Sequence, residues 1–250
     1  MERDQQRGLA RRKGGHEGAR LVVLVASLMV LAPPAWAAPR DGVRCPAPAW
    51  GAPELAGVDA ELRLAWIDAH LARTAHQARV WTWGWGTGIA VATVANLAPL
   101  AFVSPDDRID WYVGAATTAV GVVPLLVAPL DVVGDSRALA ARLAARAPTD
   151  DVCLLLADAE GKLGRDAKNQ SDGRRWWLHA GNVALNTGVG LFLALGYHHW
   201  GAGVFNAVVG TAIGEAIILT QPTSSIGDLE RYRAGRLGPD GVAIGYGRAF

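Results

Sequence analysis

The chain has 250 residues, a formal net charge of +1 and 51% hydrophobic residues. The near balance of acids and bases provides no basic surface for nucleic acid, so we expect no nucleic-acid partner. Ala, Gly and Arg are abundant while Lys is rare, a usage typical of a bacterium with a GC-rich genome.

Residues 1–37 have the three-part pattern of a secretory signal peptide. A basic stretch at 11–13 precedes the apolar run 21–32, and the small residues of 35–37 form a cleavage site. The apolar run is short for a permanent membrane-spanning helix, and an uncleaved anchor is the alternative. Both interpretations place residue 38 onward outside the cytoplasm.

A Pro-rich entry segment, residues 38–56, follows the signal peptide. It contains Cys45, and the other cysteine of the chain is Cys153. An oxidising compartment permits a disulfide between the two, which would tie the entry segment to a later helix. Two free thiols are the alternative, because the sequence supplies no geometry.

Residues 57–79 are predicted to form an amphipathic helix outside the membrane. Its apolar residues recur on one stripe at helical spacing. The predicted stripe contains Val58, Leu62, Ala65, Trp66, Ala69 and Ala72.

Four runs without Lys, Arg or Asp are predicted to cross a membrane: 80–103, 111–130, 176–197 and 200–221. A helix of about 20 residues rises about 30 Å, which matches the hydrocarbon core of a bilayer. Trp residues gather at the ends of these runs, as in interfacial aromatic belts. A soluble bundle of Ala-rich helices is the alternative.

Short connections at 104–110 and 198–199 predict that the spans form two antiparallel hairpins. Before the second hairpin, Thr149 is predicted to cap another amphipathic helix. The apolar face of that helix is predicted to be Val152, Leu155, Leu156, Ala159 and Leu163.

The two halves of the chain resemble each other. The segment LGRDAKN at 163–169 parallels LARTAHQ at 71–77, and the basic-aromatic segment at 175–177 parallels that at 79–81. These matches favour duplication of a unit made of one helix and one hairpin. A generic amphipathic helix before each membrane entry is the alternative.

Two features of the sequence disagree about the orientation of the chain in the membrane. A cleaved signal peptide and four spans leave only Arg108, among the basic residues after position 37, on the cytoplasmic side, whereas cations normally concentrate there. One resolution is that neighbouring acids neutralise the cations. In the tail, 222–250, the alternating residues of 242–250 resemble a closing strand of an outer-membrane barrel, so the outer membrane is an alternative to the inner membrane.

Polar residues within the last two spans are the candidate site. His179, Asn182 and Asn186 lie on one face of the third span, and the fourth span carries Asn206 and Glu215. Glu215 is expected to pair with His179 or Asn182 across the hairpin. One interpretation is helix packing by polar and small residues, and the other is a relay or ligand site, because an intramembrane carboxylate is costly.

No nucleophile–base pair, metal-ligand spacing or cofactor motif accompanies these residues, so an enzyme is the less favoured class. The sequence predicts an all-α membrane protein divided at 1–37, 38–56, 57–130, 131–221 and 222–250. The expected function is an inner-membrane scaffold with periplasmic helices, and a small transporter or ligand-binding protein is the alternative. Expected partners are the lipid bilayer, envelope proteins or a second copy of the chain.

Overall fold

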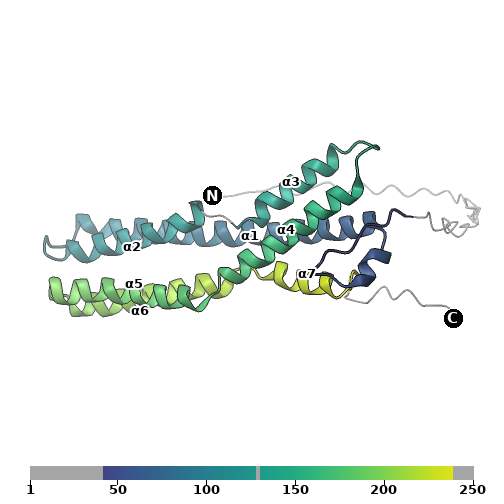
Figure 1. Cartoon of the computed structure of the whole chain (residues 1–250). Helices are drawn as coiled ribbons and strands as arrows, with labels where there is room; N and C mark the ends of the chain where they lie inside the picture. The colour runs from purple at the N-terminus through teal and green to yellow at the C-terminus, as the bar shows by residue number, and fades with distance from the viewer. Residues whose placement is uncertain (1–41, 128–129, 239–250) are drawn as a thin grey trace, which may run out of the picture. The chain divides into compact units, whose positions relative to one another are not determined.

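The computed structural model describes residues 42–127 and 130–238, and the regular structure in them is helical, as predicted (Figure 1). The predicted signal peptide and the alternating tail at 242–250 lie outside the described residues. The α-helices are α1 (Ala60–Leu97), α2 (Arg108–Val127), α3 (Val132–Ala144), α4 (Val152–Asp172), α5 (Trp176–Leu191), α6 (Trp200–Thr220) and α7 (Ser224–Arg233). Short helical turns occupy Pro53–Gly57, Ala98–Ala101 and Phe192–Gly196.

Helix α1 is continuous over 38 residues. It joins the predicted amphipathic helix and the predicted first span into one rod of about 57 Å. The helix begins where the Asp59 carboxylate accepts a hydrogen bond from the Leu62 amide at 3.1 Å. It ends just before Pro99, which has no amide hydrogen to continue the backbone ladder.

The predicted buried stripe of α1 is largely wrong. Leu62 is 44% exposed, and Ala65, Ala69 and Ala72 are also exposed, although Trp66 is buried. The buried face lies further around the helix than the predicted stripe. It includes a charged residue, Arg63, which a purely apolar pattern assigns to the surface. Its members are Ala60, Arg63, Leu64, Trp66, Ile67, Leu71, Thr74, Ala75 and Ala78, with Ile89 further along the helix.

The predicted apolar face of α4 is confirmed, since all five of its residues are buried. The predicted cap is wrong by two residues. Asp151, not Thr149, precedes the helix, and its Oδ1 accepts hydrogen bonds from the amides of Cys153 and Leu154. A carboxylate that accepts two amides satisfies more of the open helix end than one hydroxyl does.

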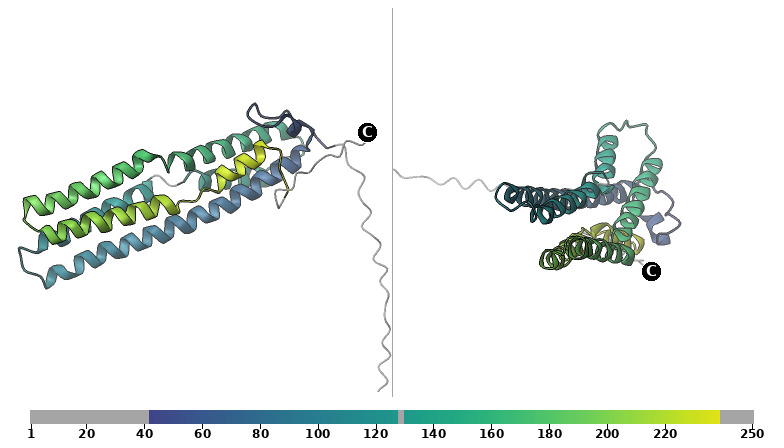
Figure 2. Two further views of the ribbon diagram at one scale, coloured as in Figure 1. Left: turned by 90° about the horizontal axis from the view of Figure 1, so that it is seen from below. Right: turned by 90° about the vertical axis from the view of Figure 1, so that its left-hand side faces the viewer.

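One hydrophobic core joins the first half of α1 with α3, α4 and α7 (Figure 2). We call this part, residues 42–79, 130–172 and 222–238, the head. A disulfide between Cys45 and Cys153, with a Cα–Cα distance of 5.4 Å, links the entry segment to α4. The head is therefore held together by both apolar packing and a covalent bond.

Beyond the head, α1 packs along α2 and α5 packs along α6 (Figures 1 and 2). The second pair approaches closely at Gly190 and Gly203, where a Cβ atom added to Gly190 would lie 2.6 Å from the Gly203 carbonyl oxygen. The two stretches Val152–Gly196 and Trp200–Arg233 contain helices long and apolar enough to cross a membrane. Only 6% of the apolar window in the second is buried, unlike the core helix of a soluble protein.

The helix starts repeat along the chain. Ala60 and Val152, Arg108 and Trp200, and Val132 and Ser224 are three pairs of starting residues, each 92 residues apart. The packing repeats as well, because α3 packs on α1 as α7 packs on α4.

Candidate functional site

The candidate site lies where α5 and α6 face each other, at the head end of the pair. His179, Asn182 and Asn186 share one face of α5, and Glu215 projects from α6. Glu215 Oε2 lies 2.5 Å from His179 Nδ1, and Glu215 Oε1 accepts a hydrogen bond from Asn182 Nδ2 at 3.0 Å. We call these four residues the polar cluster.

Each of the two amide nitrogens of the cluster donates two hydrogen bonds within the helix pair. Asn182 Nδ2 also donates to the Thr211 carbonyl at 3.0 Å. Asn186 Nδ2 donates to the carbonyl and side-chain oxygens of Asn182, at 2.9 and 2.8 Å. The Asn182 bonds fasten α5 to α6 in the manner of polar groups between membrane helices, and the Asn186 bonds hold the Asn182 side chain within α5.

Glycines make room for the two asparagines. A Cβ atom added to Gly210 would overlap the Asn186 side chain, and one added to Gly214 would overlap that of Asn182. Asn186 is 5% exposed, whereas the side chains of His179 and Glu215 are 31% and 27% exposed. The cluster is therefore buried at its amide end and open at its charged end.

Asn206 is not brought into the cluster. Its Nδ2 donates to the carbonyl of Ala202 on its own helix at 3.0 Å. At the opposite end of the pair, His199 Nδ1 lies 2.7 Å from Asp110 Oδ1 at the start of α2. The Asn206 amide thus bonds back to its own helix, while His199 connects the two helix pairs.

The cluster has the parts of a proton-holding pair, a carboxylate and an imidazole in direct contact. In the described part of the chain, the side chains hydrogen-bonded to Glu215 are those of His179 and Asn182, and neither is a nucleophile. Within 42–127 and 130–238, no group of three or more His, Cys, Asp or Glu residues is placed to hold a metal ion. Packing and proton transfer are the two roles that the geometry supports.

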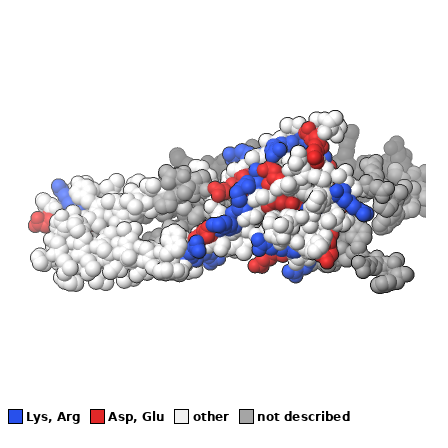
Figure 3. Space-filling model, viewed as in Figure 1, with Lys and Arg blue, Asp and Glu red and all other residues white. Residues whose placement is uncertain are grey.

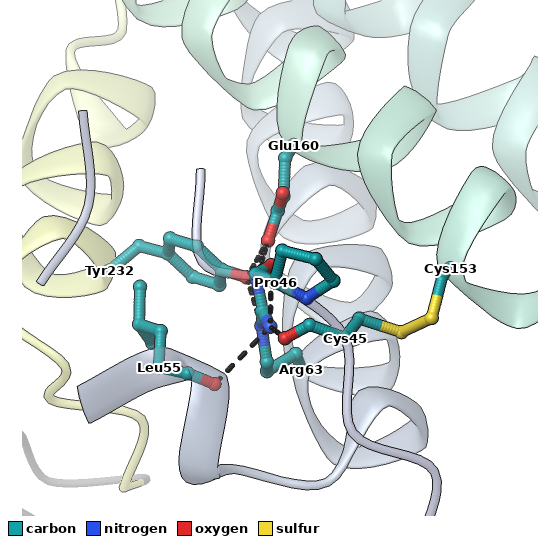
Figure 4. A network of polar contacts seen from close by, with 7 residues as sticks. All are labelled: Cys45, Pro46, Leu55, Arg63, Cys153, Glu160 and Tyr232. Atoms are coloured by element: carbon teal, nitrogen blue, oxygen red, sulfur yellow. Dashed lines mark hydrogen bonds and ion pairs between the residues drawn. A yellow bond between two sulfur atoms is a disulfide. The ribbon is translucent and has the colours of Figure 1, made fainter. Parts of the chain in front are cut away.

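A second polar network, in the head, was missed by the sequence interpretation (Figure 4). Arg63 of α1, Glu160 of α4 and Tyr232 of α7 meet in the core, where Arg63 and Tyr232 are 0% exposed and Glu160 is 5% exposed. The Arg63 guanidinium and the Tyr232 hydroxyl both donate to Glu160. The signal was present in the sequence: Arg63 follows the same helical spacing as Ile67 and Leu71.

The Arg63 guanidinium is surrounded by acceptors. Arg63 Nε donates to Tyr232 Oη at 2.9 Å, and Nη1 donates to the carbonyls of Cys45 and Leu55 at 3.1 and 3.2 Å. Pro46 supplies a further carbonyl at 3.3 Å. Burial and the hydrogen bond to Glu160 raise the pKa of Tyr232, so its phenol stays protonated. The network therefore ties the entry segment, α1, α4 and α7 together.

Asp166 of α4 is the least satisfied group of the head. It is 1% exposed, and within the described residues neither of its carboxylate oxygens accepts a hydrogen bond. Burial, and then the nearby charges of Asp135 and Asp131, raise its pKa to about 7, although Arg165 and Lys162 oppose the shift. Asp166 is thus a buried acid that titrates near neutral pH.

No protein-family model, no curated protein and no solved structure matches the chain. The function is therefore argued from the arrangement of the residues themselves.

Proposed function

We propose that the chain is an integral membrane protein of a bacterial cell envelope. In this proposal four helical segments cross the inner membrane as two antiparallel hairpins, α1 with α2 and α5 with α6. The head lies in the periplasm and acts as a non-enzymatic scaffold that binds partner proteins.

The charge distribution supports the proposed spans in α1 and α2, which are additional to those in α5 and α6. Figure 3 shows charged side chains gathered over the head and a wide band without them along the helix pairs. No Lys, Arg, Asp or Glu lies between Arg79 and Asp106. Large apolar side chains in this band face outward, including Trp83 at 74% and Val94 at 66% exposure. The hydrocarbon of a bilayer can cover such an apolar surface, whereas its exposure to water would be unfavourable.

The ion pairs of the head support its periplasmic placement. Many of its cations contact acids, for example Arg73 with Asp228 at 3.0 Å and Arg146 with Glu61 at 2.7 Å. Neutralised cations weaken the conflict with the usual excess of positive charge in the cytoplasm. The disulfide is also typical of an oxidising compartment.

Duplication of one ancestral unit accounts for the repeated starts of the helices. The unit consists of a long helix, a return helix and a short helix that packs back on the first. The buried positions agree as well. At an offset of 92, Leu64, Ile67, Leu71 and Ala75 of α1 correspond to Leu156, Ala159, Leu163 and Ala167 of α4, and all eight are buried.

The continuity of α1 is the observation that carries the scaffold proposal. Its first half is built into the locked core of the head, and its second half enters the charge-free band without a break. A continuous helix transmits orientation rigidly, so the head is held at a fixed position on the membrane. A rigid platform of this kind is suited to holding partners.

A groove at the tip of the head is the expected partner surface. It has a volume of about 400 Å³ and is lined in part by Pro46, Pro48, Trp50 and Leu154. Leu154 is 70% exposed. An exposed apolar side chain beside a groove is typical of a protein–protein contact.

Two measurements test the proposal. Cysteine labelling in cells should modify a residue placed at 107 only from the cytoplasm and one placed at 168 only from the periplasm. A photoreactive amino acid at Leu154 should give discrete cross-linked protein species, and the same residue at the exposed Ala138 of α3 should not. Recovery of the chain in the soluble fraction would refute membrane insertion, and equal cross-linking at both positions would refute the groove.

A second candidate function is supported by the polar cluster. The charged ends of His179 and Glu215 are part-exposed within the proposed span. A polar pair in hydrocarbon is costly unless it is used. A small transporter that moves protons or a solute along this pair would use it directly.

A further inference from the structure

The two proposed hairpins are joined at both ends and separated in the middle. At the head end, the indoles of Trp81 and Trp85 donate to Thr220 Oγ1 at 3.2 and 2.9 Å. At the far end, His199 contacts Asp110. Both contacts run from the α1/α2 pair to the α5/α6 pair.

Two adjoining cavities lie between these contacts. One, of about 410 Å³, has walls from α1, α2, α5 and α6, and the other, of about 450 Å³, lies between α2 and α5. They share Thr117 and Leu185, so together they form one slot, a name we keep below. Each volume lies in the range of about 300–1,000 Å³ that is usual for ligand pockets.

The wall of the slot selects an apolar occupant. Its polar side chains already use their donors within the protein: the Trp85 indole donates to Thr220, and the others donate inside their own helix pair. Thr117 donates to the Val113 carbonyl at 2.7 Å, and Thr118 donates to the Gly114 carbonyl at 3.0 Å. Asn182 donates to the Thr211 carbonyl of α6, and Asn186 donates to the Asn182 carbonyl of α5. A polar ligand would lose water without gaining partners.

The glycines of the wall fall into two groups. Gly210 and Gly214 are covered by asparagine side chains. At Gly88, Gly121 and Gly188, by contrast, an added Cβ atom would meet nothing within 4 Å. Close helix packing therefore does not require the second group, and the absence of side chains there leaves the slot open.

From these features we infer that the slot holds one acyl chain of a membrane lipid. This inference rests on the proposed insertion of the helix pairs in a bilayer. The α5 wall runs from Asn182 to Phe192, ten residues or about 15 Å, which is half of the hydrocarbon thickness of about 30 Å. The slot thus matches the depth of one leaflet, and acyl chains are the apolar molecules that surround it.

The test uses the full chain in nanodiscs of phosphatidylcholine that carries a photoreactive diazirine in one acyl chain. After illumination, mass spectrometry locates the adducts. Ile213 in the slot wall reports the inferred site, and Phe205, exposed on the same helix and outside the slot, reports ordinary surrounding lipid. Wild-type protein should carry adducts at both positions.

Cavity-filling variants supply the comparison. Gly88→Leu and Gly121→Leu place side chains in the slot and should lower labelling at Ile213 by about tenfold, which corresponds to a loss of about 1.4 kcal/mol of binding. Labelling at Phe205 should not change. Gly84→Leu, one turn earlier on α1 and also in open space, is the matched control and should label like the wild type.

The outcomes separate this inference from the proposed function. Unchanged labelling at Ile213 in both leucine variants, or no adduct there in the wild type, overturns the acyl-chain site while membrane insertion stands. Co-purification of a stoichiometric non-lipid molecule that the leucine variants lose also overturns it. Failure of the chain to enter nanodiscs overturns the membrane proposal itself.

Discussion

Arg63 and Glu160 form an ion pair that is shielded from solvent and joins the two halves of the chain. Arg63 lies on the helix that continues toward the first proposed hairpin, and Glu160 lies on the helix that leads to the second. The pair therefore fixes the relation between the two halves inside the head.

Removing one partner of this pair should be severely destabilising. Arg63→Met leaves Glu160 buried without its cation, and the expected loss of unfolding free energy is about 3–5 kcal/mol. Urea unfolding in detergent, followed by Trp fluorescence, measures it. Arg146→Ala breaks the exposed pair with Glu61 and should cost less than about 1 kcal/mol. Equal losses in the two variants would show that burial of the pair is unimportant.

The triple variant Arg63→Met, Glu160→Leu, Tyr232→Phe removes all members of the network together. The buried charges and the hydroxyl are then removed together, whereas the Cys45 and Pro46 carbonyls lose their Arg63 donor, so part of the lost stability should return. The same urea titration checks it. A triple variant as unstable as Arg63→Met would mean that the unpaired Glu160 charge is not the cause of the loss.

The disulfide should contribute strongly because it closes a long loop. Cys45 and Cys153 are 108 residues apart. Replacing both by Ser should lower the unfolding free energy by about 2–5 kcal/mol. Dithiothreitol should destabilise the wild type by a similar amount and leave the double-Ser variant unaffected. A wild type that does not respond to full reduction would contradict this prediction.

Asp166 should make the head less stable as pH rises. Its pKa is about 7 in the folded chain and 3.8 when unperturbed, so the folded state binds the proton more tightly. This group therefore supports folding fully below about pH 4, and the support is lost as pH rises through about 7. At pH 8 Asp166→Asn should be more stable than the wild type by about 2–4 kcal/mol, and at pH 4 the two should be equal.

Thermal unfolding between pH 4 and 8 measures this difference. Asp172→Asn is the control, because a hydrogen bond from Lys168 lowers the pKa of Asp172 and so moves its titration further from neutral pH. That variant should keep the pH dependence of the wild type. An Asp166→Asn variant with an unchanged pH dependence would assign the titration to another group.

Helix boundaries were well predicted where charge or proline marks them. The structure begins α5 at Trp176 and α6 at Trp200, as the charge-free runs indicate, and Pro222 follows the end of α6. The junction at residue 79 was not a boundary, because no residue there interrupts the backbone ladder. A change from charged to apolar side chains alters the surroundings of a helix without ending it.

The inner faces were harder to predict because tertiary partners decide them. The burial of Arg63 depends on partners far away in the sequence, among them Glu160, 97 positions later, which neutralises its charge. Within the candidate site, the contacts of Glu215 with His179 and Asn182 follow from the similar depth of these residues below the head ends of α5 and α6. The slot has no sequence signature, since glycines that pack helices and glycines that leave space look identical in a sequence.

Close approach of α5 and α6 should depend on Gly203. A Cβ atom there would lie 3.2 Å from the Cβ of Ala194 and would press on the Gly190 carbonyl. Gly203→Ala should therefore cost about 1–3 kcal/mol through overpacking. Gly201→Ala, two residues earlier and in open space, should be neutral or slightly stabilising. Unfolding by added sodium dodecyl sulfate compares the two, and equal costs would refute the close contact.

Replacement of Glu215 decides between packing and proton transfer. In Glu215→Gln, the amide oxygen still accepts from Asn182 Nδ2, and the amide nitrogen can donate to neutral His179. Packing is thus retained, and we expect normal accumulation, a stability change below about 1 kcal/mol and unchanged cross-linking at Leu154. Glu215→Leu removes the acceptor of both His179 and Asn182, and Asn182 keeps its hydrogen bond to the Thr211 carbonyl, so the variant should cost about 1–3 kcal/mol.

Proton transfer predicts a different pattern. A glutamine cannot release a proton, so a relay would lose all proton flux in liposomes that contain a pH-sensitive dye, although the protein stays folded. The scaffold proposal expects no flux in the wild type and no difference between the wild type and Glu215→Gln. Flux in the wild type that disappears in Glu215→Gln but survives in the distant Asn206→Ala variant would establish the relay and displace the scaffold as the primary function.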